Sequence, residues 1–251
     1  KVVDFRDAPS LATARGAVDV MRVESPTADK LETLSHLLHS LPDRRVIVFV
    51  NYRDAAERVY NAMKKSSLPV GLYHGGLDQI DRDKAIVRLN NGTTPILIAT
   101  DLGSRGLDID AVDAVVHYHM PGSQETWTHR NGRTARMGAS GSVYVIESPA
   151  DDVPEWVVTE RDYVPATPDG RVVSHTATLF FDAGKKDKIS RGDIVGYLCQ
   201  QGGLPAASIG KIDLRDRFAY VAVPAEAIKP LLKELADKKL KGKKVRISEA
   251  K

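Results

Sequence analysis

Short apolar runs recur along the first 150 residues of the chain and are separated by more polar stretches. A continuous apolar run of this length is typical of a strand that is buried on both faces, as in a parallel sheet. The runs predict five strands, at residues 46–51, 70–75, 95–100, 114–119 and 141–147.

The stretches around the first runs have the period of a helix. Leucines at positions 31, 34, 37, 38 and 41 form one apolar face of a helix that we predict over residues 26–41. Two further helices are predicted at 53–66 and 78–92. Strands that alternate with helices predict an α/β fold, in which helices layer a parallel sheet.

This alternation stops after residue 148. Four prolines fall between residues 149 and 168, and they interrupt any long helix or strand. We therefore predict a first domain over residues 1–148, a linker region over 149–177 and a second domain over 178–251.

The second domain has a different order of elements. Its pattern predicts a β-α-β-β-α-β order, which is that of a split-βαβ, ferredoxin-like α+β sandwich. The predicted strands are 178–183, 209–214, 218–223 and 243–248, and the predicted helices are 190–201 and 225–239.

Composition narrows the class of protein. The 251 residues suit two domains, and 42% hydrophobic with 27% charged residues is usual for a soluble protein. No apolar run approaches a membrane span, so no membrane partner is expected. Cys199 is the only cysteine, which favours a reducing, cytoplasmic setting. The opening "KVVDFRDAPS" has neither Met nor a signal peptide, so we expect a part of a longer protein.

Charge is divided unequally along the chain. Residues 178–251 hold 16 Lys and Arg against 9 Asp and Glu, a net +7, whereas residues 1–177 hold 20 against 24, a net −4. A basic domain indicates a polyanionic partner. The alternative, that "KKLKGKK" is only a solvated face, stays open on charge alone.

Glycines and polar residues follow the predicted strands. Asn51 and Arg53 come after the first strand, Gly75 and Gly76 after the second, and "TDLGSRGLD" after the third. Ligands of parallel sheets gather at the carboxyl ends of the strands, where glycines allow close approach and arginines bind phosphate oxygens. Each feature alone also fits a turn, a helix cap or a surface ion pair. A further basic stretch, "HRNGRTARMG", precedes the last strand.

Together these motifs resemble a known family. "VIVFVN", "HGGLDQIDR", "ATDLGSRGLD" and "HRNGRTARMG" resemble, in order and spacing, the second RecA-like domain of DEAD-box RNA helicases over residues 20–148. The tail, with "TLFFDAGKKDKISRGDIVGYL", resembles the carboxy-terminal RNA-binding domain of the DbpA/YxiN group. Members of that group pair a helicase core with a module that recognises a hairpin of large-subunit ribosomal RNA.

The resemblance implies roles for residues of the first domain. Arg133 and Arg136 correspond to arginine fingers, which stabilise charge on the γ-phosphate during ATP hydrolysis. His129 and Arg130 correspond to residues that join the motif to a partner domain. Residues that correspond to nucleotide contacts are Gly106 and Asp108, and those that correspond to contacts with the RNA backbone are Asn51, Arg53, Gly76, Arg82, Thr100 and Arg105.

In the second domain, the predicted sheet would display aromatic rings. Phe180 and Tyr220 are expected to stack on bases, as in an RNA-recognition motif, although packing in the core remains an equal alternative for Phe180. The usual glycine and last aromatic of that motif are absent. Cations expected to contact phosphates and RNA loops are Lys185, Lys186, Lys188, Arg191, Lys243, Lys244 and Arg246.

Two motifs of an ATPase are absent from the sequence. It contains no GxxxxGK[ST] and no Asp-Glu-Ala-Asp string, which hold phosphates and Mg²⁺. The resemblance therefore implies that an amino-terminal RecA-like domain of the same protein supplies the ATP and Mg²⁺ ligands, and that this chain alone is inactive as an ATPase. No metal site is expected here, since His117 and His119 share a strand face but lack a third ligand.

Two other functions stay open. "HRxGRTxR" also occurs in superfamily-2 ATPases that act on DNA. A second alternative is a non-catalytic adaptor that only binds RNA.

Overall fold

The computed structural model describes residues 17–101, 109–135, 140–166 and 171–251. Its first domain is built on a sheet of seven strands in the order β3-β4-β2-β5-β6-β1-β7. Every neighbouring pair in this sheet is parallel. The strands are β1 (Val18–Glu24), β2 (Val46–Phe49), β3 (Val70–Tyr73), β4 (Ile96–Ala99), β5 (Ala114–His117), β6 (Gly141–Glu147) and β7 (Arg161–Asp162).

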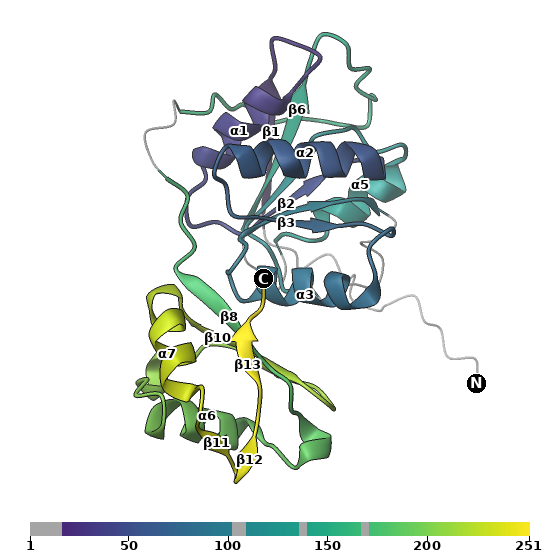
Figure 1. Ribbon diagram of the computed structural model, residues 1–251. Helices are drawn as coiled ribbons and strands as arrows, with labels where there is room; N and C mark the ends of the chain where they lie inside the picture. Colours follow the sequence, from purple (N-terminus) through teal and green to yellow (C-terminus); the bar gives the residue numbers. More distant parts are fainter. Residues whose placement is uncertain (1–16, 102–108, 136–139, 167–170) are drawn as a thin grey trace, which may run out of the picture.

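Helices cover both faces of this sheet (Figure 1). The helices α1 (Leu31–His39) and α2 (Arg53–Lys65) pack in one apolar cluster, and α3 (Gln79–Asn90) and α5 (Gln124–Asn131) pack in another. Neighbouring residues of β2 point into opposite clusters, Val48 toward α1 and α2 and Ile47 toward α3 and α5. The predicted α/β fold with a layered parallel sheet is confirmed.

Several elements differ from the prediction. The sequence pattern did not predict β1, β7 or α5. Helix α1 begins at Leu31 rather than at residue 26, because a turn precedes it. In that turn the Ser25 hydroxyl donates to the Thr27 carbonyl at 3.0 Å, and the Thr27 hydroxyl donates to the Asp29 carbonyl at 2.8 Å.

The second domain contains a four-stranded antiparallel sheet in the order β13-β8-β10-β9. Its strands are β8 (Thr176–Phe181), β9 (Ile212–Leu214), β10 (Ala219–Pro224) and β13 (Ile247–Glu249), its helices α6 (Arg191–Gln200) and α7 (Ile228–Leu235). Three short 3-10 helices accompany them, η2 (Lys185–Asp187), η3 (Ala206–Ser208) and η4 (Ala225–Ala227). The predicted small α+β domain is confirmed.

The last predicted strand, 243–248, is divided in two. Its first residues form β12 (Lys243–Lys244), which pairs with β11 (Lys239–Leu240) in a separate hairpin. Only β13 joins the main sheet, beside β8.

Helix α3 joins the two domains (Figure 1). Its Val87 packs with Tyr220 of β10 and with Ala250, which follows β13. Beyond the end of the helix, the hydroxyls of Thr93 and Thr178 hydrogen-bond at 2.7 Å. One face of the small sheet therefore packs on α6 and α7, and the other lies against α3 of the first domain.

The predicted linker region also contacts the first domain. Strand β7 pairs with β1, and the ring of Tyr163 lies 5.1 Å from that of Tyr144. Within the described residues, no helix is long and apolar enough to cross a membrane.

Candidate nucleic-acid interface

The carboxyl ends of β2, β3, β4 and β5 lie at one edge of the parallel sheet, since all strands run in the same direction. Asn51 follows β2, Gly75 and Gly76 follow β3, Asp101 follows β4 and His119 follows β5. The structure therefore brings Asn51, Arg53 and Gly76 to the same edge, although they are separated along the chain.

Arg53 lies against the double-glycine turn. A Cβ atom added at Gly75 would lie 3.4 Å from Arg53 Nη2, and one at Gly76 would lie 3.5 Å from Arg53 Cδ. The Gly76 N–H donates to Nδ1 of the buried His74 at 3.0 Å, and a Cβ at Gly76 would lie equally close to that nitrogen. The absence of a side chain thus lets the turn fold onto His74 and leaves Arg53 and backbone exposed together.

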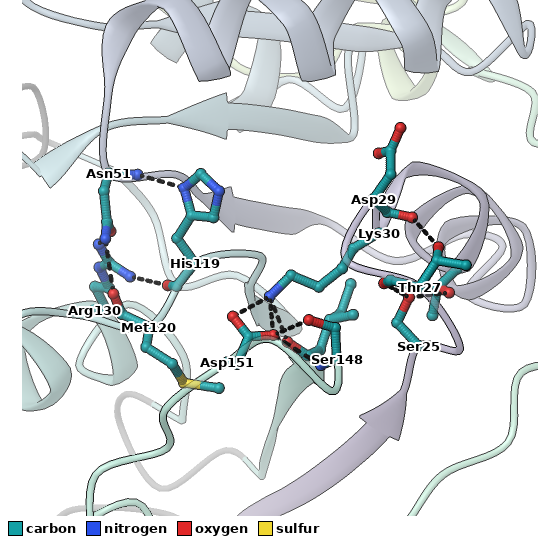
Figure 2. A network of polar contacts seen from close by, with 12 residues as sticks. Ser25, Thr27, Asp29, Lys30, Asn51, His119, Met120, Arg130, Ser148 and Asp151 are labelled. Atoms are coloured by element: carbon teal, nitrogen blue, oxygen red, sulfur yellow. Dashed lines mark hydrogen bonds and ion pairs between the residues drawn. The ribbon is translucent and has the colours of Figure 1, made fainter.

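Arg130 is a buried side chain with several polar partners, and Figure 2 shows it beside Asn51 and the carbonyl of His119. It is only 1% exposed, and its guanidinium donates to both carboxylate oxygens of Asp101, at 2.7 and 2.5 Å. Further bonds reach the Asn51 side-chain oxygen at 2.8 Å and the His119 carbonyl at 2.9 Å. Arg130 therefore ties the ends of β2, β4 and β5 to α5.

This position corrects the role that the resemblance implied for Arg130. The side chain faces the interior of its own domain, over the ring of Phe49, and cannot contact a partner domain. The sequence offered one signal for this role: Asp101 follows a buried strand, and a carboxylate in such a position favours a nearby cation. The network also fixes Asn51, whose amide donates to the Met120 carbonyl at 2.8 Å.

The two histidines at the end of β5, His117 within the strand and His119 after it, are structural in this domain. His117 is fully buried, lies 2.8 Å from the Asn131 side-chain oxygen through Nε2, and stacks on Trp127 with 4.4 Å between ring centroids. Burial, and then the charge of Arg130, lowers the pKa of His117 to about 3, so its ring is neutral. Burial also lowers the pKa of His119. Among the described residues, no group of three His, Cys, Asp or Glu side chains is placed to hold a metal.

Backbone bonds hold the loop that carries Arg133. The Arg133 N–H donates to the Arg130 carbonyl at 3.1 Å, and its own carbonyl accepts from Val112 N–H at 3.0 Å. The Thr134 hydroxyl donates to the Val112 carbonyl at 2.6 Å. Arg133 is partly exposed, so the loop presents a positioned cation.

The other predicted residues of the first domain differ in how accessible they are. His129 is exposed on α5, with a side-chain exposure of 56%. Thr100, only 4% exposed at the end of β4, offers an RNA strand little surface. Arg82, on α3, donates to the Gln79 side chain at 2.8 Å. Residues Arg105, Gly106, Asp108 and Arg136 lie outside the described residues.

The predicted cations of the tail form what we call the basic surface, comprising Lys185, Lys186, Lys188, Lys243, Lys244 and Arg246. Two bonds place the η2 loop beside the β11–β12 hairpin: Lys243 Nζ donates to the Asp187 carbonyl at 3.2 Å, and Lys241 Nζ to the Lys188 carbonyl at 3.0 Å. All six cations are exposed, as is Arg191 at the start of α6. Nearby acids partly neutralise them, because Lys186 pairs with Asp216 at 3.3 Å and Lys243 with Asp187 at 3.5 Å.

Among the aromatic residues of the small sheet, Tyr220 is buried, whereas Phe180 and Phe218 are partly exposed. Phe180, Phe218 and Tyr220 contact one another, with ring centroids 5.5 to 5.9 Å apart. Tyr220 is 4% exposed and packs with Val87 of α3. The expectation of an open stacking face is therefore wrong for Tyr220 in this arrangement, because α3 covers that ring, whereas Phe180 stays partly exposed.

Comparisons with known proteins agree with this architecture. Residues 29–138 match the helicase conserved C-terminal domain, and residues 178–249 match the DbpA RNA binding domain. The chain is 33% identical to the ATP-dependent RNA helicase DbpA of Escherichia coli over 232 residues, which cover 89% of this chain and 51% of that protein. It is 25% identical to the Bacillus subtilis protein of the same name, covering 88% and 53%.

A solved structure shares the fold of the first domain. The Escherichia coli DEAD-box protein SrmB superposes with a TM-score of 0.55 at 29% identity, over 64% of this chain and 99% of that one. The chain spans about half the length of the two DbpA relatives. It carries a helicase conserved C-terminal domain followed by a DbpA RNA binding domain and is similar to the DbpA relatives over most of its own length, consistent with a C-terminal portion of a DbpA-type DEAD-box helicase.

Proposed function

We propose that this chain is the part of an ATP-dependent RNA helicase that completes the ATPase site and binds structured RNA. The observation that carries the proposal is the edge of the parallel sheet. There the buried Arg130 joins Asn51, on the expected RNA side, to the helix that leads into Arg133. One network thus supports both an RNA contact and a catalytic cation.

The nucleotide side rests on Arg133. Its loop is fixed by backbone bonds and its side chain is partly exposed, which suits a guanidinium that must meet charge developing on a phosphate. Such an arginine finger accounts for about 10³ to 10⁵ in rate. Arg136, Gly106 and Asp108 remain proposed nucleotide contacts.

ATP and Mg²⁺ would be held mainly by another domain. The sequence contains neither GxxxxGK[ST] nor an Asp-Glu-Ala-Asp string, so the Mg²⁺ ligands are proposed to lie on an amino-terminal RecA-like domain of the same protein. That domain would hold Mg²⁺, which would supply positive charge to neutralise the phosphates. The contribution of this chain is positive charge at the opposite side of the nucleotide.

RNA would lie along the same edge of the sheet. Arg53 and the backbone of Gly76 are exposed side by side, with Asn51 at the neighbouring strand end. These groups suit contacts with a sugar-phosphate backbone, which position a strand without reading its sequence. Arg82 and Arg105 are proposed to extend the track, and Thr100 could contribute only if the strand end moved.

The tail would provide most of the affinity for RNA. Its net charge of +7, against −4 for the rest, places the favourable electrostatics there. We propose a hairpin of large-subunit ribosomal RNA as the target and the cytoplasm as the compartment. The basic surface and Arg191 would contact its phosphates.

The nucleotide proposal is tested in the longer protein that includes the upstream domain. The chain alone should show no RNA-stimulated ATP hydrolysis. In the longer protein, Arg133→Ala should lower turnover at least about a hundredfold without loss of folding. Arg171→Ala, at an exposed site, is the control. Full turnover of the Arg133 variant would refute the assignment, and RNA binding with no ATPase activity in the longer protein would favour the adaptor.

The RNA proposal is tested by salt. With about four phosphates neutralised, the logarithm of the affinity should fall against the logarithm of salt with a slope of roughly −3 to −4. Replacing Lys185, Lys186 and Lys188 by Ala should flatten the slope by about one unit for each lost contact. As a control, replacing Lys229, Lys233 and Lys251 by Ala removes the same charge outside the basic surface. This control should change the salt slope less. Tighter binding of a DNA hairpin than of the matched RNA would favour the DNA-directed alternative.

A further inference from the structure

Helix α3 covers part of the aromatic face of the small sheet, so that Tyr220 is buried and Phe180 and Phe218 are only partly exposed for bases to stack on. Tyr220 is 4% exposed, and its ring packs with Phe180 and Phe218 beneath α3. A domain that recognises a hairpin must still contact unpaired bases, because the bases of an RNA duplex are poorly accessible to side chains. The restricted aromatic face therefore favours another surface of the tail for this contact.

A groove of about 510 Å³ lies beside α7 and the edge strand β13. Its volume falls within the range of about 300 to 1,000 Å³ that is usual for small-molecule sites. It is separate from the face that α3 covers, since α7 packs on the opposite side of the sheet. The groove is lined by Asp182, Leu232, Leu235, Ala236, Lys244, Val245, Arg246 and Ile247.

The lining combines an apolar floor with a charged rim. Leu235 and Val245 are 2% and 8% exposed, so they belong to the core and form a firm floor. Lys244 and Arg246 are exposed at the rim. The carboxylate of Asp182 accepts from the Arg246 N–H at 2.7 Å, and the Asp182 N–H donates to the Arg246 carbonyl at 3.1 Å. This pair of bonds fixes the rim relative to β8.

We propose that this groove receives one unpaired nucleobase of the RNA bound by the tail, an inference that rests on the proposed function. The apolar floor would contact the face of the base, and the carboxylate of Asp182 would accept from its ring or exocyclic N–H. Lys244 and Arg246 would neutralise the flanking phosphates. Charge favours RNA over a peptide as the occupant, because the groove lies next to the other cations of the basic surface in a domain of net charge +7.

The groove predicts a preference for loops over helices. A base within a duplex is stacked and paired, so it cannot enter without the cost of opening the helix, whereas a loop base is already free. The contact is mainly apolar, and it should depend little on salt. Filling the groove should therefore weaken hairpin binding while duplex binding and the salt slope stay the same.

The experiment compares Ala236→Trp with Ala207→Trp in the full chain. Ala236 lines the groove and is exposed at the end of α7, and Ala207 is exposed in η3, outside the groove. The probes are an RNA hairpin carrying 2-aminopurine at one loop position at a time and a blunt RNA duplex with the same stem. We expect about tenfold weaker hairpin binding for Ala236→Trp, loss of the fluorescence change at one loop position, and unchanged duplex binding. Ala207→Trp should match the unaltered chain.

A second variant covers the case in which tryptophan disturbs folding. Asp182→Asn keeps an oxygen that can accept from Arg246 N–H but removes the charge facing the base. It should alter the ratio of affinities among hairpins that differ only in that loop base. Equal hairpin binding by both tryptophan variants, or an unchanged ratio for Asp182→Asn, would overturn the groove while leaving RNA binding in place. A chain that binds neither hairpin nor duplex would overturn the proposed function as well.

Discussion

The two sheets of this molecule are covered in different ways. The seven-stranded parallel sheet is enclosed by helices of its own domain on both faces, and both apolar clusters are local to it. The four-stranded sheet packs on α6 and α7 on one face only, and the other face lies against α3. An aromatic face that resembles a nucleic-acid platform thus serves to join two domains.

Cations show the same contrast. In the first domain the central cation, Arg130, is buried and paired, where its value is structural. In the tail, the cations of the basic surface are exposed, where surface ion pairs contribute little and phosphates can be reached. A cation in a sequence motif therefore indicates a ligand contact only when the side chain is exposed; a buried cation indicates a structural role.

Arg130→Ala should have the largest effect on stability. It removes the buried guanidinium that donates to both carboxylate oxygens of Asp101 and to the side-chain oxygen of Asn51. Loss of one partner from a buried ion pair costs about 3 to 5 kcal/mol in the free energy of unfolding, and the lower end of this range is expected here because the Asp101 side chain is 35% exposed. Urea denaturation measures this change, with Arg171→Ala as the exposed control. A loss below about 1 kcal/mol would mean that Arg130 is not a structural residue.

Tyr220→Ala should weaken the joint between the domains. Burial of a large apolar side chain contributes about 1.5 to 3 kcal/mol, and here that burial is supplied partly by Val87 of α3. Hydrogen exchange should become faster at backbone amides of α3 while the core of the parallel sheet stays protected. As a control, Tyr52→Ala, at a residue that is 71% exposed, should leave hydrogen exchange unchanged in α3 and in the core of the parallel sheet. Unaltered protection of α3 in the Tyr220 variant would show that the two domains are not held together by this face.

His117 makes the stability of the first domain depend on pH. Its pKa falls from an ordinary value near 6.5 to about 3 in the folded state, so the folded protein binds fewer protons than the unfolded chain below pH 6.5. Stability is fully present above about pH 6.5 and is lost as the pH falls toward 3, by up to about 1.4 kcal/mol per pH unit from this group.

The check is the unfolding free energy of the unaltered chain and of His117→Gln from pH 7 to pH 5. The variant keeps an amide N–H for Asn131 but does not titrate. The difference between the two proteins should shrink as the pH falls. A difference independent of pH would mean that folding does not shift the pKa of His117.

The fold was predictable where the sequence carries a local signal. Apolar runs such as 46–51 and 95–100 identify buried strands, because both faces of a central parallel strand are covered. Helix α5 lacked such a signal: its only buried residue is Arg130, so no apolar stripe marks it. Strand β1 is held by β6, more than a hundred residues away, a pairing that no local pattern reports.

The site was predictable in position more than in role. Strand direction placed Asn51, Arg53 and Gly76 at one edge before any contact was known. The inward orientation of Arg130 depends on Asp101, which approaches only when β4 and α5 pack together. Likewise, period-two alternation placed Phe180 and Tyr220 on one face, but whether that face meets solvent or α3 is decided by the docking of two domains.

The ion pair between Lys211 and Asp110 should have the smallest effect. Lys211, which precedes β9 in the tail, places its Nζ 2.7 Å from Asp110 Oδ2 of the first domain. The two side chains are 50% and 43% exposed. Exposed pairs contribute about 0.2 to 1 kcal/mol and are screened by salt. A double-mutant cycle with Lys211→Ala and Asp110→Ala, read as protection of α3 amides, should give a coupling in this range that fades with salt. The pair Lys238–Glu234, 3.2 Å apart and within the tail, is the matched control and should leave α3 unaffected. A coupling well above 1 kcal/mol would move the main strength of the joint from the apolar face to this ion pair.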